Sequence, residues 1–140
     1  VEACAGALRG FPKSVAVQEY GFAVLWVLGQ DPGVHKAFVE HKVVSAVIAG
    51  MGEHRERVAV QEYGCGLIRV MCDSSENKAF IKAEGGIGAV VKGMVEHGDH
   101  TGVQEHGSAA LRLMSANSEI NKVFREHKLK TQNAGQQPPA

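Results

Sequence analysis

The sequence lacks three things: an excess of charge of one sign, a long apolar run and a paired set of cysteines. Its 15 basic residues balance its 15 acidic residues, so no net attraction to nucleic acid or an anionic membrane is expected. No apolar run approaches 18 residues, so no membrane insertion is expected. The three cysteines, Cys4, Cys65 and Cys72, are few and odd in number, which does not suggest a disulfide framework. They fit a reducing compartment, and we expect a cytoplasmic protein.

What the sequence does contain is an internal repeat. The string VAVQEY occurs at 15–20 and again at 58–63, and VQEH occurs at 103–106; the shared VQE therefore begins at 17, 60 and 103, at intervals of 43 residues. The flanking segments match as well, because VSAVIAGMGEH at 44–54 aligns with IGAVVKGMVEH at 87–97. A period of 20 to 50 residues is typical of solenoids, propellers and other repeat arrays.

Each repeat contains apolar residues at helical spacing. The longest pattern comprises Val17, Tyr20, Val24, Leu25 and Leu28, with counterparts Val60, Tyr63, Leu67, Ile68 and Met71, and Val103, His106, Ala110, Leu111 and Met114. This spacing predicts a long helix with one apolar stripe facing the core. A middle helix is predicted over 44–51 and 87–94, and a short element carries Phe38, Phe80 or Phe124. No segment alternates with period two for long, which disfavours a propeller.

Glycines also recur at fixed repeat positions. Gly21, Gly64 and Gly107 lie inside the predicted long helices, and Gly50 and Gly93 lie in the middle helices. A glycine inside a helix costs about 1 kcal/mol relative to alanine. The repetition of this cost predicts that a neighbouring helix packs too closely there for a Cβ atom.

The segment VQEYGCGLIRVMCDSSENKAFIKAEGGIGAVVKGMVEH at 60–97 resembles an armadillo repeat: a long apolar helix, then N-K-x-x-F, then G-G-I opening the middle helix. The resemblance covers residues 1–128, as a partial repeat at 1–30, repeats at 31–73 and 74–116, and a partial repeat at 117–128. It implies an all-α, right-handed α-solenoid of three-helix repeats. The long helices of such a solenoid line a concave groove that binds extended peptides or other proteins.

The sequence departs from the family where that groove would hold its peptide. Armadillo proteins commonly carry an Asn near the end of each long helix and a Trp one turn earlier. The Asn position is occupied here by Val27, Val70 and Leu113, and the Trp position by Ala23, Gly66 and Ala109. An Asn ladder that reads a basic peptide is therefore not expected.

A different ladder recurs on the long helices. It comprises Glu19, Glu62 and Glu105, then Trp26, Arg69 and Arg112 seven residues later, with Gln30 and Asp73 beyond them. Seven residues are two helical turns, so the two sets share nearly one face. Because Trp and Arg are enriched at binding hot spots, we hypothesise that these residues bind a partner protein or peptide. The alternative is a solvated face whose Glu and Arg residues pair between repeats.

No constellation predicts catalysis or a metal. Of the seven histidines, the densest group is His97, His100 and His106, and no acidic or cysteine ligand completes a recognised zinc spacing. EGGIG at 84–88 has neither the preceding strand nor the Lys-Ser/Thr of a phosphate loop. We therefore expect a non-catalytic scaffold without a cofactor.

The two ends of the repeat array carry apolar residues that look unpaired. Val1, Cys4 and Leu8 occupy one end and Phe124 the other, although solenoids need polar caps. We expect a piece of a longer array, or ends covered by a partner or by self-association. A second hypothesis is therefore a structural subunit held through its ends and its tail. The tail, 129–140, has no apolar periodicity and is expected to be disordered or a linker.

Overall fold

The structure, a computed structural model, describes residues 1–114 and 117–135 and is all-α over that range. Its helices are α1 (Glu2–Gly10), α2 (Val15–Gly29), α3 (His35–Glu40), α4 (Val43–Glu53), α5 (Val58–Met71), α6 (Ser75–Ala83), α7 (Gly86–Glu96), α8 (Thr101–Met114) and α9 (Asn117–Gly135). A single 3₁₀ turn, η1 (Pro32–Val34), precedes α3. No described helix is both long enough and apolar enough to cross a bilayer.

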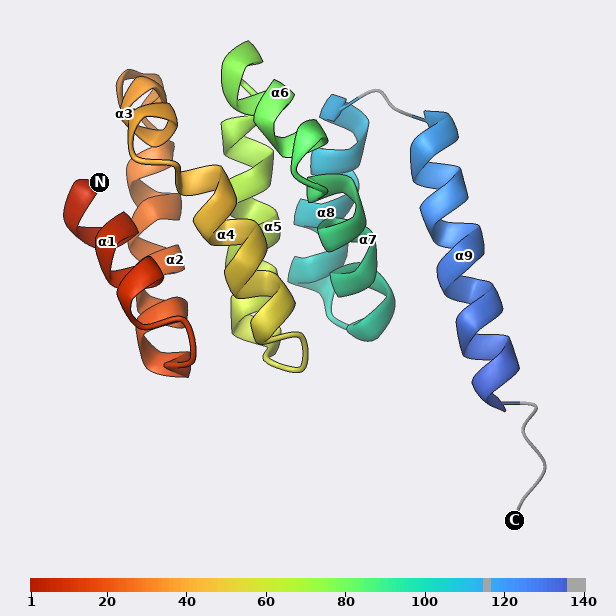
Figure 1. Cartoon of the computed structure of the whole chain (residues 1–140). Coiled ribbons are helices and arrows are strands. Elements are labelled where there is room, and N and C mark those ends of the chain that lie inside the picture. The colour runs from red at the N-terminus through yellow and green to blue at the C-terminus, as the bar shows by residue number, and fades with distance from the viewer. Residues whose placement is uncertain (115–116, 136–140) are drawn as a thin grey trace.

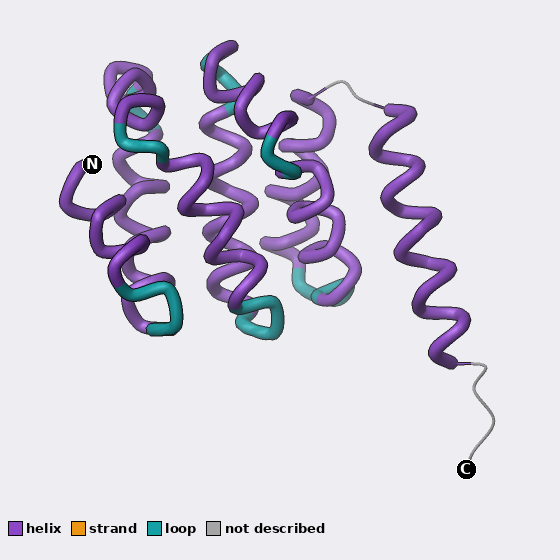
Figure 2. The backbone as a smooth tube through the Cα atoms, viewed as in Figure 1, coloured by secondary structure: helices purple, strands orange, loops and turns teal. Residues whose placement is uncertain are grey.

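The helices repeat in space with the period of the sequence. The long helices α2, α5 and α8 begin at Val15, Val58 and Thr101 and lie side by side in one row (Figure 1). The middle helices α1, α4 and α7 form a second layer against that row, and short loops join the elements (Figure 2). The central helix α5 packs against both α2 and α8.

The starts of the helices also use equivalent positions. Ser14 caps α2 by accepting a hydrogen bond from the backbone N–H of Val17, and the Nδ1 of His100 accepts the equivalent bond from Val103 in α8. Such a cap satisfies a backbone donor that has no partner within the helix. Lys42 and Gly85, which precede α4 and α7, both have a left-handed backbone, with φ of 54° and 86°.

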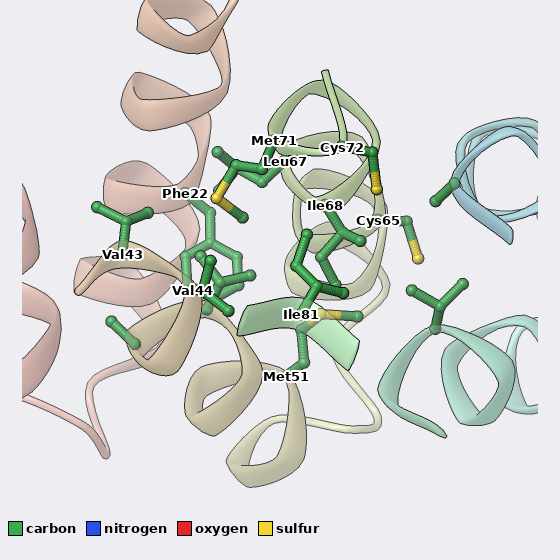
Figure 3. Packing of buried hydrophobic residues seen from close by; sticks show 14 of the residues in the cluster. Phe22, Val43, Val44, Met51, Cys65, Leu67, Ile68, Met71, Cys72 and Ile81 are labelled. Atoms are coloured by element: carbon green, nitrogen blue, oxygen red, sulfur yellow. The ribbon is translucent and has the colours of Figure 1, made fainter. Parts of the chain in front are cut away.

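The predicted apolar stripe is confirmed in α5 and α8 but only partly in α2. Leu67, Ile68 and Met71 are fully buried, and they pack with residues of the other helices in the core (Figure 3). In α2, Leu25 is buried, whereas Tyr20, the counterpart of Tyr63, is 74% exposed. The stripe is buried where a long helix has the long helix of the preceding repeat beside it. Among the described residues, α2 has a long-helix neighbour on one side only.

The recurring glycines do mark close contacts, as predicted. A Cβ atom at Gly64 would lie 2.6 Å from the Sδ of Met51, and one at Gly107 would lie 2.6 Å from the Sδ of Met94. At Gly21 it would lie 2.7 Å from the Cδ2 of Leu8. These distances are shorter than van der Waals contact. One residue of each middle helix therefore packs directly on the backbone of the following long helix.

The glutamine of the VQE string is a structural clamp in every repeat. In the first, Gln18 donates from Nε2 to the carbonyls of Leu8, at 3.0 Å, and Phe11, at 3.1 Å. The other two repeats reproduce this pair of bonds, with Gln61 donating to Met51 and His54 and Gln104 donating to Met94 and His97. Carbonyls in the last turn of a helix have no partner within that helix. Each long helix thus caps the end of the middle helix that precedes it.

Hydrogen bonds between consecutive repeats fix their stacking. His54 bonds through Nε2 to the carbonyl of Pro12, and His97 bonds in the same way to that of Arg55, both at 2.8 Å. Asn77 donates from Nδ2 to the carbonyl of His35 at 3.1 Å. The recurrence of these contacts explains why polar residues, and not only apolar ones, keep the 43-residue period.

One expectation about the ends of the chain is wrong. Leu8 is not part of an open face, because only 3% of it is exposed and it packs against Gly21. The segment 129–135, expected to be disordered or a linker, is helical, since α9 continues to Gly135. The rest of the predicted tail, 136–140, lies outside the described residues. Near its start α9 packs on α7 and buries Ile120.

Candidate functional site: the face of the long helices

Three rings from three different long helices meet on one face of the row. The indole of Trp26 lies 5.7 Å from the ring of Tyr63 and 5.2 Å from that of His106, measured between centroids, and its contact with His106 is edge-on. Trp26 therefore reaches across α5 from α2 to α8. It has room to do so because residue 66 is glycine: a Cβ there would lie 2.9 Å from the indole Nε1.

A hollow of about 410 Å³ lies beside these rings, at the C-terminal half of the long helices. We name it the Trp26 hollow. It is lined by Trp26, Gln30, Arg69, Val70, Asp73, His106 and Leu113. Its walls therefore combine aromatic and aliphatic side chains with a guanidinium, a carboxylate and the amide of Gln30.

A second, more open hollow of about 500 Å³ adjoins the first and lies over α5 and α8. We name it the Arg112 hollow. It is lined by Arg69, Gln104, Glu105, Ser108, Ala109 and Arg112. Arg69 lines both hollows, and its Nη1 lies 3.4 Å from the Nδ1 of His106. Arg69 therefore lies where the two hollows meet.

Most of the residues proposed from the sequence as partner-binding line these two hollows. Those that do are Trp26, Gln30, Arg69, Asp73, Glu105 and Arg112. Glu19 and Glu62 do not. Glu19 instead lies 3.8 Å from the Nε of Arg57, and Glu62 lies 3.6 Å from the Nε2 of His100. These are contacts between consecutive repeats, as the alternative hypothesis expected, although the partners are not Arg69 and Arg112.

Sequence reasoning missed three residues of the Trp26 hollow. Val70 and Leu113 were considered only as positions where the asparagine of armadillo repeats is absent, and His106 only as a counterpart of Tyr63 and as one of a group of histidines. The sequence could have indicated Val70 and Leu113, because they directly follow Arg69 and Arg112, two of the residues proposed to bind a partner. Leu113 is 40% exposed, so this position provides apolar contact area on the face.

The two buried cysteines, Cys65 and Cys72, are poor nucleophiles. Burial raises the pKa of the Cys65 thiol to about 12. It also raises the pKa of Cys72 to about 11, an effect that the nearby charge of Lys78 reduces. Because the thiolate is the reactive form of cysteine, both side chains act as small apolar packing residues. No three His, Cys, Asp or Glu side chains gather as metal ligands in the described part of the chain.

The chain was compared with protein-family models, with curated proteins and with solved structures, and none of them matches.

Proposed function

We propose that the chain is an armadillo-type right-handed solenoid and a non-catalytic module that binds a partner protein or peptide along the face of α2, α5 and α8. The carrying observation is that two adjoining hollows open on this one face and share Arg69. A continuous surface with an aromatic side chain and two arginines has the composition of a binding hot spot. We place this activity in the cytoplasm, in keeping with three cysteines that are not paired.

Arg69 and Arg112 are exposed. Trp26 is half-buried and packs against the rings of Tyr63 and His106 on the two neighbouring long helices, and the Nη1 of Arg69 contacts the Nδ1 of His106. The face therefore combines a well-packed aromatic side chain with two guanidiniums that a partner can reach, which supports binding as its role.

The test is a comparison of captured partners between charge-reversal variants. Arg69→Glu/Arg112→Glu reverses the charge of the face, and Arg125→Glu makes the same change at an exposed position on α9. Far-UV circular dichroism checks the fold of each. We expect specific partners from the source cells to be lost with the double variant and kept with Arg125→Glu. Identical partners with all three proteins would exclude this face as the binding surface.

A second function, a structural subunit held through its ends, is favoured by the outer side of α2. This side exposes the apolar residues Tyr20, Val24, Val27 and Leu28. In α5 the counterparts of Tyr20 and Leu28 are Tyr63, which contacts Trp26 of α2, and Met71, which is fully buried. If this side carries an assembly contact, Val24→Glu abolishes the association in sedimentation velocity while Arg112→Glu leaves it intact.

A further inference from the structure

We propose that two copies of this chain pair through the outer side of α2, with the two α2 helices antiparallel about a two-fold axis. This inference rests on the second function proposed above and names the molecule that covers that side. It is separate from peptide binding, because the exposed apolar residues of this side line neither the Trp26 hollow nor the Arg112 hollow.

The outer side of α2 carries the kind of residue that the chain buries wherever two long helices stack. Val24 and Leu28 are exposed, whereas their counterparts in α5, Leu67 and Met71, are fully buried. Large apolar side chains that gather on one exposed side of a protein mark a contact surface. The residues gathered here are Tyr20, Val24, Val27 and Leu28.

This side can pair with a copy of itself because no charge on α2 opposes it. The only charged residue of α2 is Glu19, and it is directed to the next repeat, where its Oε1 lies 3.8 Å from the Nε of Arg57. A two-fold contact uses the same patch on both copies, so that patch must complement itself. An uncharged apolar stripe meets this condition.

The other end of the row is occupied within the chain. There α9 lies beyond α8 (Figure 1) and packs on α7, where it buries Ile120. A second copy that stacked its α2 on α8 would have to displace α9. We therefore expect the α2 end to meet another α2 end, a contact that closes after two copies and does not propagate into a filament.

The layers of the fold favour the antiparallel orientation. The helices α1, α4 and α7 form a layer on one side of the row, and α1 lies at the same end as α2 (Figure 1). A two-fold axis at right angles to α2 keeps these layers of both copies on one side, so the two α1 helices also approach each other. An axis along α2 would put the layers on opposite sides and leave both α1 helices uncovered.

The charges at the two ends of α2 are complementary in the antiparallel orientation. Lys13 and Asp31 flank the helix, and both are exposed. Antiparallel pairing centred near Val24 brings Lys13 of each copy to the end where the other copy has Asp31. Asp31 uses Oδ1 to accept from the N–H of Gly33, which leaves its second oxygen for the lysine. Parallel pairing would instead set like charges against each other at both ends.

The first experiment is sedimentation velocity on the full 140-residue chain between about 1 and 100 µM, where a modest interface dissociates. We expect dimers at the high concentrations. Val24→Glu places two like charges beside the two-fold axis and should leave only monomers over this range. Val95→Glu makes the same change at a similarly exposed valine of α7 and should leave the dimer unchanged. Far-UV circular dichroism checks the helices of both variants.

A mixing experiment tests the orientation. Lys13→Glu and Asp31→Lys should each weaken the dimer roughly tenfold, because each turns two attractions into two repulsions. An equimolar mixture of the two variants should regain the wild-type affinity, since each changed end then meets an opposite charge. Parallel pairing predicts no loss for Lys13→Glu alone, because like charges would face each other before and after the change. An undiminished Lys13→Glu dimer would therefore overturn the inference.

Two further results would overturn it: a wild-type chain that stays monomeric throughout the range, and a dimer that survives Val24→Glu. The second function survives the first of these if a protein captured from the source cells is lost with Val24→Glu and kept with Val95→Glu. It falls together with the inference if no association of the chain depends on Val24.

Discussion

The glutamine clamp can be tested by replacing Gln61 with methionine, which keeps the length of the side chain and removes its donor. In the structure, Gln61 is 2% exposed and donates to the carbonyls of Met51, at 2.9 Å, and His54, at 3.0 Å. The His54 carbonyl also accepts from the backbone N–H of Arg57, so the substitution costs it one of two bonds. The Met51 carbonyl loses the donor that caps the end of α4.

The magnitude follows from these two carbonyls. Leaving a buried acceptor unsatisfied costs about 1–3 kcal/mol, and losing one hydrogen bond of two costs about 0.5–1.5 kcal/mol. Gln61→Met should therefore lower the free energy of unfolding by about 2–4 kcal/mol. Urea denaturation followed by far-UV circular dichroism measures this, with a midpoint about 1–2 M lower for a slope near 2 kcal/mol/M.

The chain supplies its own graded control for this prediction. Gln18 is equally buried and makes the same pair of bonds, whereas Gln104 is only part-buried. Water can replace the donor more readily near the surface, so Gln104→Met should cost less than half as much as Gln18→Met or Gln61→Met. Equal losses at all three positions, or a loss below about 1 kcal/mol at Gln61, would refute the clamp as the reason for the repeated glutamine.

Three further predictions concern single positions. Gly85→Ala should destabilise the chain by about 1 kcal/mol, because alanine disfavours the φ of 86° at this position, although no atom lies within 4 Å of the new Cβ. Lys42→Gly at the equivalent position should not destabilise the chain, and thermal melts of the two variants measure the difference. Burial raises the pKa of Cys65 to about 12 and that of Cys72 to about 11, so both should resist iodoacetamide at pH 8.5 until urea unfolds the chain, and the partly exposed Cys4 should react first. Mass spectrometry of the peptides measures this order, and early modification of Cys65 would contradict its burial. Gly66→Ala should push the indole of Trp26 away from His106, so the emission maximum shifts to the red, and an unchanged spectrum would mean that Gly66 does not make room for the ring.

The helical fold and its period could be predicted from the sequence, because both follow from local patterns. The spacing of Val60, Leu67 and Met71 places them on one face of any α-helix, and these residues are buried. The exposure of Tyr20 could not be predicted in this way, since it depends on what lies beside α2 and not on the pattern within it. Likewise, the contact between Trp26 and His106 joins positions 80 residues apart. It requires α2 and α8 to approach across α5, which no single helix determines.

The repeated positions divide into two groups, and the division bears on function. Where all three repeats keep the same residue, as at Gln18, Gln61 and Gln104, the side chain holds a middle helix to the following long helix. A stacked array needs such a contact in every unit, since each unit meets only its neighbours.

The position of Trp26 behaves in the opposite way, because its counterparts are Arg69 and Arg112. The three side chains share a backbone environment, yet packing has not imposed one residue type on them. Each lines a hollow on the same face, where the difference between an indole and a guanidinium changes what the surface can bind. Glu19 and Glu62 contact Arg57 and His100 of the following repeat, whereas Glu105 keeps the same residue type and lines the Arg112 hollow. Variation at the Trp26 position therefore accompanies a place on this face, and identity at the glutamine position accompanies a contact within the fold.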